Sequence, residues 1–501
     1  MNARLLIRRN GESARLADVP LMAVPSFRNA ILDAVAEECR IASLFARETP
    51  RGVELTVVVA DDAAGELGLA RTRLTDRFDS LTPECAQAHL FEREIAEQYG
   101  VVPVGHPWLK PVRSHDPLSG GKRVFGEPAA GVIDFFRVDG DEVHEVAVGP
   151  VHAGVIEPGH FRFQCHGETV FHLEIALGYQ HRGIERALVG GPDKKSVFYM
   201  ETAAGDTTIG HALAYAHAIE ALAGVKAPAR AQSLRGIALE LERLANHTGD
   251  LGALSGDVAF LPTASFCGRI RGDFLNITAE LCGSRFGRGL VRPGGVGFDV
   301  SNTHASLLLQ RLKTATRFAG DAVALLWSTP TVIERFEGTG AVDPDTAEEI
   351  GMVGVAARGC GRSIDVRHDF PFGIYRFAHI PVMTAHHGDV NSRALVRWLE
   401  LQRSSEFVAA QLCALPVTPI ATPLPGSLAP DSIVASLTEG WRGEICHVAI
   451  TDADGRFARY KITDPSFHNW FGLALALREG EISDFPLCNK SFNLSYCGHD
   501  L

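Results

Sequence analysis

The strongest hydrophobic pattern in the chain lies between residues 234 and 251, where apolar side chains recur every three or four positions. This spacing predicts a long amphipathic helix with one apolar face. A second stripe of the same segment carries charged and polar side chains at similar spacing, namely Glu240, Arg243, His247 and Asp250. By itself, this second stripe is typical of a solvated helix face with local ion pairs.

The first part of the chain, residues 1–125, has the pattern of an α+β domain. A helical stretch is predicted over residues 27–47, and the β-branched run at residues 53–59 predicts a strand.

A second helix of this region is predicted to begin at the sequence Thr82-Pro83-Glu84. Thr82 can cap free backbone N–H groups, Pro83 suits the first helical position, and Glu84 complements the positive end of the helix dipole. The predicted helix includes residues 89–100.

A polar segment rich in glycine and proline follows, and we place a linker at residues 126–144. Residues 145–501 form the second region, whose patterns are mainly helical. The chain shows no internal repeat and no low-complexity tract. The sequence therefore predicts two domains joined by one linker.

The composition is that of an ordinary globular protein, with 501 residues, 46% of them hydrophobic and 22% charged. The formal net charge of −12 argues against a nucleic-acid partner but not against a protein partner. The 10 cysteines include no Cys-x-x-Cys pair, which indicates reduced thiols rather than a disulfide framework. We find neither a signal-peptide core nor a bilayer-spanning apolar run, so we expect another subunit to provide any attachment to a membrane.

Residues 149–185 read GPVHAGVIEPGHFRFQCHGETVFHLEIALGYQHRGIE. This segment resembles the opening of the large subunit of group 4 (energy-converting) nickel–iron hydrogenases and of its relative in respiratory complex I, the 49 kDa (D-type) subunit. Further similar segments are residues 241–247, 283–296, 388–393, 441–444 and 464–470. The resemblance implies a mainly α-helical domain, a helix bundle with small peripheral β-sheets. The charged stripe would then be buried in the bundle and would have to be paired.

Residues 92–100 read Glu-Arg-Glu-Ile-Ala-Glu-Gln-Tyr-Gly, and Gly-His-Pro follows at residues 105–107. This run is similar to the signature of the 30 kDa (C-type) subunit of complex I, although Glu97 stands where that family usually has aspartate. The alternative interpretation is an exposed, charged helix face. A C-type domain ahead of a D-type domain is the arrangement of the large subunits of formate hydrogenlyase and hydrogenase-4.

The metal-ligand positions of the hydrogenase family are altered in this chain. The family motif Arg-x-Cys-Gly-x-Cys-x-x-x-His falls within residues 201–211, where Ala204 and Thr207 stand at the two cysteine positions. The family's terminal Asp-Pro-Cys-x-x-Cys matches a segment in which Ser495 and Gly498 stand at the cysteine positions. Because nickel prefers soft thiolate ligands, the resemblance predicts a chain without a nickel–iron centre.

Cys497 and His499 lie beside the altered terminal positions. They could form a displaced pair of metal ligands, but one thiol and one imidazole cannot replace four thiolates. The simpler interpretation of Cys497 is a small, buried apolar residue.

Two residues of the 149–185 segment are candidates for proton chemistry. Glu157 lies where group 4 hydrogenases keep a carboxylate that passes protons to and from the metal ligands, and an ordinary turn residue is the alternative. His152 lies in the loop that in complex I offers a histidine to the quinone headgroup. The loop is shorter here than in complex I, and a surface histidine is the alternative.

The resemblance supplies further candidate residues. His181 and Arg182 belong to a segment that, in the related subunits, packs near the terminal iron–sulfur cluster of the neighbouring small subunit. Arg358 matches an arginine that lies over the diatomic ligands of the iron in true hydrogenases, so its retention indicates either a reused cavity or a buried ion pair. The vacated pocket would keep a polar lining of Asp206, Thr207 and His211.

These resemblances predict the large subunit of a membrane-associated, hydrogenase-related or complex I-like oxidoreductase complex on the cytoplasmic side of a membrane. The chain would bind no cofactor itself and would shape the cavity beside a 4Fe–4S cluster of a small iron–sulfur (B-type) partner, with electron transfer to quinone. Membrane-arm subunits, of the H-type and antiporter-like kinds, are the other expected partners. The chain has no dinucleotide fingerprint, so a link to NADH would run through other subunits.

Two alternatives stay open at this point. A quinone-reducing site could use His152 or His181 in the vacated pocket, and a scaffold could assemble redox subunits without touching substrate. A buried polar cavity would favour the enzyme, since such cavities are costly to maintain. Apolar packing around Ala204 and Thr207 would favour the scaffold.

Overall fold

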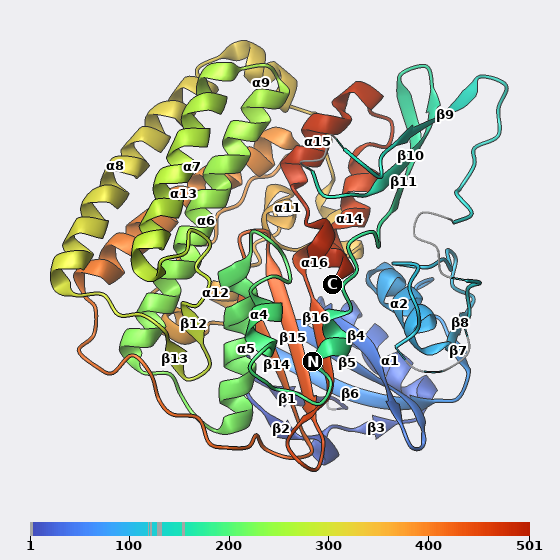
Figure 1. Ribbon diagram of the computed structural model, residues 1–501. Helices are drawn as coiled ribbons and strands as arrows, with labels where there is room; N and C mark the ends of the chain where they lie inside the picture. Colours follow the sequence, from blue (N-terminus) through green and yellow to red (C-terminus); the bar gives the residue numbers. More distant parts are fainter. Residues whose placement is uncertain (1–3, 119, 121–122, 128–132, 153–155) are drawn as a thin grey trace.

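The computed structural model describes residues 4–118, 120, 123–127, 133–152 and 156–501 (Figure 1). A bundle of long helices occupies one side of the molecule, and the N-terminal sheet lies on the other side. The C-terminal strands and helices, drawn in orange and red, lie between them. Within the described ranges, no helix is long and apolar enough to cross a membrane.

The N-terminal region forms a five-stranded sheet with two main helices. Its strands are β1 (Leu6–Arg8), β3 (Leu21–Met22), β4 (Arg40–Thr49), β5 (Gly52–Asp61) and β6 (Glu66–Leu74), in the order β1-β6-β5-β4 with β3 paired to β6. Helices α1 (Val24–Ala36) and α2 (His89–Tyr99) pack against these strands. The α+β character of this region is confirmed, and so is the predicted strand at residues 53–59, which lies within β5.

The helix predicted over residues 27–47 is wrong in its second half. Helix α1 ends at Ala36, and strand β4 begins at Arg40. Between them Glu38 has a φ of 64°, a left-handed conformation that a continuing α-helix does not contain. Pairing of β4 with β5 in the buried sheet therefore overrides the helical pattern, and neither glycine nor proline marks the break.

The predicted helix start at Thr82 is also wrong, because α2 begins at His89. The Thr82 hydroxyl donates to the Glu92 carboxylate at 2.6 Å and so caps no helix. The same carboxylate accepts hydrogen bonds from the Ser80 hydroxyl at 2.5 Å and from the Leu81 N–H at 2.7 Å. Glu92 thus fixes the loop that precedes its own helix.

The helix bundle consists of α6 (Ala229–Asp257), α7 (Leu261–Cys282), α8 (Asn302–Trp327) and α13 (Val390–Cys413). The apolar stripe predicted at residues 234–251 lies on α6, and it belongs to the largest hydrophobic core up to Leu244, whereas Leu251 belongs to a neighbouring core. The amphipathic helix is therefore confirmed.

The charged stripe of α6 is buried, so its interpretation as a solvated face is wrong. Its ion pairs are Arg243–Glu240 at 3.1 Å and Arg397–Asp250 at 2.7 Å, and His247 Nε2 makes a hydrogen bond to Glu400 at 2.9 Å. The pairing that the family resemblance implied is therefore present. An unpaired charge at this depth would destabilise the fold strongly.

A second sheet lies in the middle of the molecule. Strands β14 (Ser432–Glu439), β15 (Glu444–Thr451) and β16 (Phe457–Thr463) join β2 (Ala14–Arg15) in the order β16-β15-β14-β2. Helix α5 (Thr208–Ala223) packs on this sheet, β4 contacts β16, and every residue of β14 and β15 is buried. The expectation of peripheral sheets is therefore wrong here, because neighbouring elements cover both faces of this sheet.

A third sheet does lie at the edge of the molecule (Figure 1). It contains β9 (Val143–Val148), β10 (His160–His166) and β11 (Thr169–Ala176) in the order β11-β10-β9. The division into residues 1–125, 126–144 and 145–501 stays a prediction, and residues 128–132 of the expected linker lie outside the described residues.

The remaining helices and strands are short. They are β7 (Arg77–Asp79), β8 (Val102–Val104), α3 (Ile184–Leu188), α4 (Ser196–Met200), β12 (Val291–Arg292), β13 (Gly295–Val296), α9 (Pro330–Phe336), α10 (Pro344–Glu349), α11 (Gly354–Gly359), α12 (Val366–Asp369), α14 (Pro465–Ala476), α15 (Phe485–Phe492) and α16 (Tyr496–Asp500).

Helix α2 joins the N-terminal region to the central sheet through buried charges. The Glu94 carboxylate lies 2.7 Å from Lys461 Nζ on β16 and also pairs with Arg113. Glu97 accepts hydrogen bonds from the backbone N–H groups of Arg113 and Ser114. The Glu-Arg-Glu run is therefore buried, and its interpretation as an exposed face is wrong.

Replacing Lys461 by methionine should lower the free energy of unfolding by about 3–5 kcal/mol, because two buried carboxylates, Glu94 and Glu185, lose a cation. Chemical denaturation measures the change. As a control, Arg403→Met removes an exposed pair with Glu406 and should cost less than about 1 kcal/mol. Equal losses in the two variants would contradict a structural role for the buried pair.

We expect the protein to lose stability in acid because of His468, a buried residue on α14. The side chain packs against the Phe91 ring, and burial lowers its pKa from 6.5 to about 3. The unfolded chain therefore binds a proton that the folded chain rejects, and stability falls as the pH drops from about 6.5 toward 3. His468→Leu should reduce the pH dependence of the unfolding free energy by about 1.4 kcal/mol per pH unit in this window. An unchanged dependence in denaturation at several pH values would show that His468 does not titrate in this way.

Candidate functional site

The two altered halves of the hydrogenase-type ligand motif meet in the structure. The Arg182 guanidinium donates to the carbonyl oxygens of Ala203 at 2.8 Å and Cys497 at 3.0 Å, and so ties the turn at residues 201–207 to helix α16. We call residues 201–207 and 495–498, together with the side chains that fill the space between them, the ligand-position site.

The residues at the four cysteine positions do not fit a nickel–iron centre. Ala204 has no donor atom, and Thr207 offers only a hydroxyl. The Ser495 hydroxyl accepts the Gly498 N–H at 2.9 Å and thereby caps α16. A Cβ atom added to Gly498 would lie 2.7 Å from the carboxylate carbon of Asp464, so this carboxylate fills the space that a cysteine side chain would need.

Cys497 and His499 do not supply the missing ligands. Burial, together with the neighbouring Glu157 carboxylate, raises the pKa of the Cys497 thiol to about 12, so the free thiol is protonated at neutral pH. His499 Nδ1 lies 3.0 Å from the Asp500 carboxylate. In the part of the chain that the structure describes, no group of three or more His, Cys, Asp or Glu side chains could hold a metal ion.

Four buried side chains form a continuous row of hydrogen bonds beside the former ligand positions. The Tyr460 hydroxyl lies 2.9 Å from His447 Nδ1, and His447 Nε2 lies 3.0 Å from His211 Nδ1. His211 Nε2 lies 3.0 Å from Asp464 Oδ2. Helix α5, strands β15 and β16 and the first residue after β16 supply these groups. We call this row the histidine relay.

Asp464 fixes the hydrogen-bond roles at one end of the relay. Burial opposes ionisation of Asp464, but the bond from His211 and the charge of Arg442 hold its pKa below the usual range. An ionised Asp464 accepts the hydrogen bond, so His211 Nε2 carries a proton. Burial lowers the pKa of His447 far below its usual value, so this ring is neutral between His211 and the Tyr460 hydroxyl. The row thus links Asp464 to two imidazole rings, groups that can pass a proton.

An ion pair lies next to the relay. The Arg442 guanidinium lies 2.6 Å from the Asp206 carboxylate and donates to the Thr207 hydroxyl at 3.3 Å. Burial opposes ionisation of Asp206, but Arg442 outweighs it and lowers the pKa of this carboxyl. The positions that carry cysteines in hydrogenases are thus surrounded by polar and charged side chains.

Glu242 of α6 caps the N-terminus of α5. Its carboxylate accepts from the N–H groups of Ile209 at 2.7 Å and Gly210 at 3.2 Å. Burial raises the pKa of Glu242 to about 8, against the effect of these two bonds, and the charge of Asp206 adds to the rise. Glu242 can therefore hold or release a proton near neutral pH.

Glu157 lies at the edge of the ligand-position site. Its carboxylate accepts the Tyr496 N–H at 3.0 Å and lies against the Cys497 thiol. These contacts with α16 go beyond those of an ordinary turn residue. The role of Glu157 in proton transfer stays a prediction.

His181 and His152 lie at the borders of this region. His181 Nδ1 lies 2.8 Å from the Asp500 carbonyl at the end of α16, and burial lowers its pKa to about 4. His152 Nε2 lies 2.8 Å from the Gly159 carbonyl, a contact within its own loop. Residues 153–155 of this loop lie outside the described residues.

Arg358 belongs to a buried ion cluster and takes no part in the relay. Its guanidinium lies 2.8 Å from Glu400 and 2.8 Å from Glu439, and the residue is 0% exposed. Of the two sequence-based interpretations, the geometry favours the buried ion pair over the reused cavity.

Sequence reasoning did not assign a role to several residues of this region: Glu242, Arg442, His447, Tyr460 and Asp464. A signal existed for Arg442 and Asp464, because both lie in family-like segments, residues 441–444 and 464–470. No pattern links His447 to His211, which is 236 positions away in the sequence.

Gly498→Ala should lower the free energy of unfolding by about 1–3 kcal/mol, because the new methyl group would lie 2.7 Å from the Asp464 carboxylate. Alanine otherwise favours a helix over glycine, so the loss would be due to this contact. Gly205→Ala is the matched control, since a Cβ atom there meets no atom within 4 Å. Denaturation of both variants checks the prediction, and a loss that persists in an Asp464→Ala background would contradict it.

Comparisons with known proteins agree with this architecture. Residues 51–120 match the family described as the 30 Kd subunit of respiratory-chain NADH dehydrogenase, and residues 257–426 match the family of its 49 Kd subunit.

Similar curated proteins come from hydrogenase-related and complex I-like systems. Formate hydrogenlyase subunit 5 of Escherichia coli is 29% identical over 84% of this chain and 76% of its own length. Hydrogenase-4 component G of the same organism is 28% identical over 84% of this chain and 75% of its own length. NADH-quinone oxidoreductase subunit 4 of Thermus thermophilus is 28% identical over 68% of this chain and 90% of its own length. The predicted resemblance is therefore confirmed: the chain fuses a domain of the complex I 30 kDa subunit family to a domain of the 49 kDa subunit family.

Proposed function

We propose that the chain is the large subunit of a membrane-associated oxidoreductase complex, and that it forms the electron-accepting cavity beside a partner's 4Fe–4S cluster without a nickel–iron centre of its own. The observation that carries this proposal is the Asp464 carboxylate, which fills the space of a thiolate at Gly498 and ends a buried row of proton-carrying groups. A position that binds nickel in hydrogenases would thus serve proton transfer here.

Quinone is the electron acceptor that this arrangement suits best. Reduction of a quinone to a quinol takes two electrons and two protons. The partner's cluster would supply the electrons one at a time, and solvent would supply the two protons, with the last transfer passing through His211 and Asp464 of the histidine relay. One similar protein is named as a subunit of an NADH-quinone oxidoreductase, and that name is consistent with this choice. His152 and His181 are alternative proton donors to the headgroup.

An exposed apolar patch near the ligand-position site suits the small iron–sulfur subunit. Phe198 on α4 is 56% exposed and Phe298 is 42% exposed. Arg292, which pairs with Glu201 of the ligand-position site, lies over the Phe198 ring at 5.9 Å. Large apolar side chains around an arginine are typical of protein interfaces. Membrane-arm subunits, of the H-type and antiporter-like kinds, would complete the complex and hold it on the cytoplasmic side of the membrane.

A non-catalytic scaffold is the alternative. Apolar packing around Ala204 and Thr207 would favour it, but Asp206, Arg442 and Asp464 occupy this region instead. Burying charged groups costs free energy that a scaffold could avoid with apolar side chains. The polar filling therefore supports a chemical role.

Elemental analysis of the complex, isolated without oxygen from its own host, tests the absence of the metal centre. We expect iron from the partner's clusters and less than about one nickel atom per ten copies of the chain, because the donor set does not suit nickel. Nickel near one atom per copy would overturn the proposal.

A relay variant tests the proton path. His211→Gln can still donate to Asp464 but cannot pass a proton on, so quinone reduction by the complex should slow about 100-fold. His217→Gln, on the same helix but outside the relay, is the control and should keep the parental rate. The partner's cluster should still be reduced in both variants, as seen by electron paramagnetic resonance. A parental rate in His211→Gln would favour the scaffold.

A further inference from the structure

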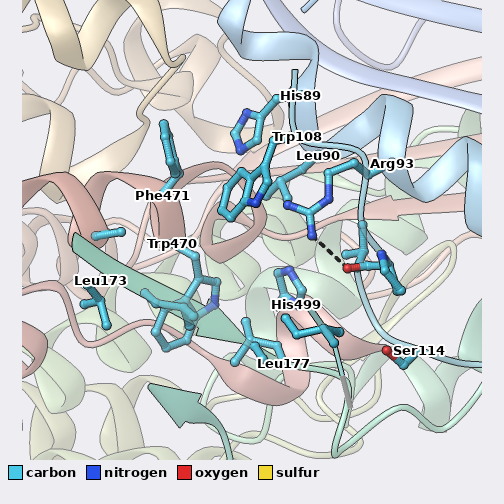
Figure 2. Close-up of a pocket in the computed structure, with 16 residues that line it drawn as sticks. His89, Leu90, Arg93, Trp108, Ser114, Leu173, Leu177, Trp470, Phe471 and His499 are labelled. Carbon is cyan, nitrogen blue, oxygen red and sulfur yellow. Dashed lines mark hydrogen bonds between the residues drawn. The ribbon is translucent and has the colours of Figure 1, made fainter. Parts of the chain in front are cut away.

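Two of the cavities in the described part of the chain differ in their room for a binding partner. The cavity between α2, β11 and α14 is filled by its own side chains, since the Trp108 and Phe471 rings lie 5.9 Å apart (Figure 2). The other cavity is an open groove of about 450 Å³. It is lined by residues 10–13, the end of α5, the start of α6 and residues 372–377, and we call it the α5–α6 groove.

Two glycines keep the α5–α6 groove open. Gly224 ends α5 with a φ of 65°, and Gly11 has a φ of 69°, both in the left-handed region that favours glycine. A Cβ atom added to either residue would meet no atom within 4 Å. The chain therefore turns at both positions without filling the space in front of them.

The two carboxylates in the wall of the groove already have partners. Glu220 lies 2.5 Å from Arg235 on α6 and also accepts the Gly294 N–H at 2.7 Å. Glu12 accepts the Arg9 N–H at 3.1 Å, a contact within its own turn. The negative charges of the wall are thus engaged with groups close to them.

Two cations of the groove have no such partner. Among the described residues, neither Lys226 nor Arg376 forms an ion pair, and both side chains are exposed. Arg376 Nε donates to the Pro371 carbonyl at 3.2 Å, which leaves the two terminal nitrogen atoms of the guanidinium to donate elsewhere. Phe377, the next residue, is 83% exposed. The groove therefore combines uncompensated positive charge with an aromatic surface.

An extended peptide suits this groove better than a small molecule does. Sites for small molecules bury about 70–90% of the ligand surface, but Lys226, Arg376 and Phe377 all lie in contact with solvent. Carboxylates form charge-assisted hydrogen bonds with arginine and lysine, and clusters of such cations recognise acidic segments. Aromatic side chains are enriched in protein interfaces.

We propose that the α5–α6 groove binds an acidic peptide segment of a partner protein, with an apolar side chain among its carboxylates. The carboxylates pair with Lys226 and Arg376, and the apolar side chain packs on Phe377. The groove lies at the C-terminal end of α5, whereas His211 of the relay lies in the first turn of this helix. Binding requires no turnover, so the proposal does not rest on the proposed function.

Fluorescence anisotropy on the full chain tests the proposal with labelled five-residue peptides. We expect Asp-Glu-Phe-Asp-Glu to bind at least about 10-fold more tightly than its amide analogue Asn-Gln-Phe-Asn-Gln, and more tightly than Asp-Glu-Ala-Asp-Glu. Equal binding of the acidic and amide peptides would overturn the proposal. Displacement of the acidic peptide by an equal concentration of inorganic phosphate would also overturn it, because the groove would then be a site for small anions.

Variants test the residues assigned to the groove. Lys226→Gln combined with Arg376→Gln should weaken binding of the acidic peptide at least about 10-fold. Lys313→Gln removes an exposed lysine of α8 and is the matched control, which should bind as the unaltered chain does. Phe377→Ser should remove the preference for the peptide with phenylalanine over the one with alanine. Equal losses in the control and in the double variant would refute the assignment.

Charge reversal separates loss of the site from loss of the fold. Lys226→Glu combined with Arg376→Glu should bind Lys-Arg-Phe-Lys-Arg at least about 10-fold more tightly than the unaltered chain does. A chain that no longer folds would not show this gain together with loss of the acidic peptide. Unchanged binding of the basic peptide by a folded double variant would contradict the proposal.

Discussion

The Glu400 carboxylate on α13 is the point at which the buried charges of the helical region converge. Arg358 of α11 lies 2.8 Å from it, and His247 and Arg243 of α6 lie at 2.9 Å and 3.4 Å. Burial opposes ionisation of Glu400, but these groups hold its pKa well below the usual range. Since each partner would be left uncompensated without the others, the cluster fixes three helices in one relative position.

The same cluster places the residues of the ligand-position site. Arg243 donates to the carbonyl oxygens of Glu439 at 2.8 Å and Gly440 at 3.0 Å, at the end of β14 and the start of the turn to β15. Arg442, two residues later, pairs with Asp206. The position of the ligand-position site therefore depends on buried charges that do not contact it. Arg358 has a structural role in this cluster that requires no metal ion.

The sequence was informative where structure depends on local periodicity and uninformative where it depends on distant pairing. The apolar stripe at residues 234–251 and the strand at residues 53–59 could be predicted because each pattern is complete within a few turns or pleats. The strand that begins at Arg40 and the burial of β15 could not, because both depend on neighbours elsewhere in the chain. For the site, motif comparison located Ala204 and Gly498, but only the folded chain brings Asp464 against Gly498.

The pairing of β2 with β14 has a consequence for how the chain folds. Arg15 lies opposite Ser432 and Ala14 opposite Ile433, so the central sheet joins segments more than 400 positions apart. During synthesis, the N-terminal sheet can form early, but β2 has no partner until almost the whole chain has left the ribosome. Closure of such a long loop is slow, and an unpaired strand edge can associate with other chains in the meantime. The central sheet, with the relay residues His447 and Tyr460 on it, therefore forms late, and slow growth or a chaperone would favour a productive fold.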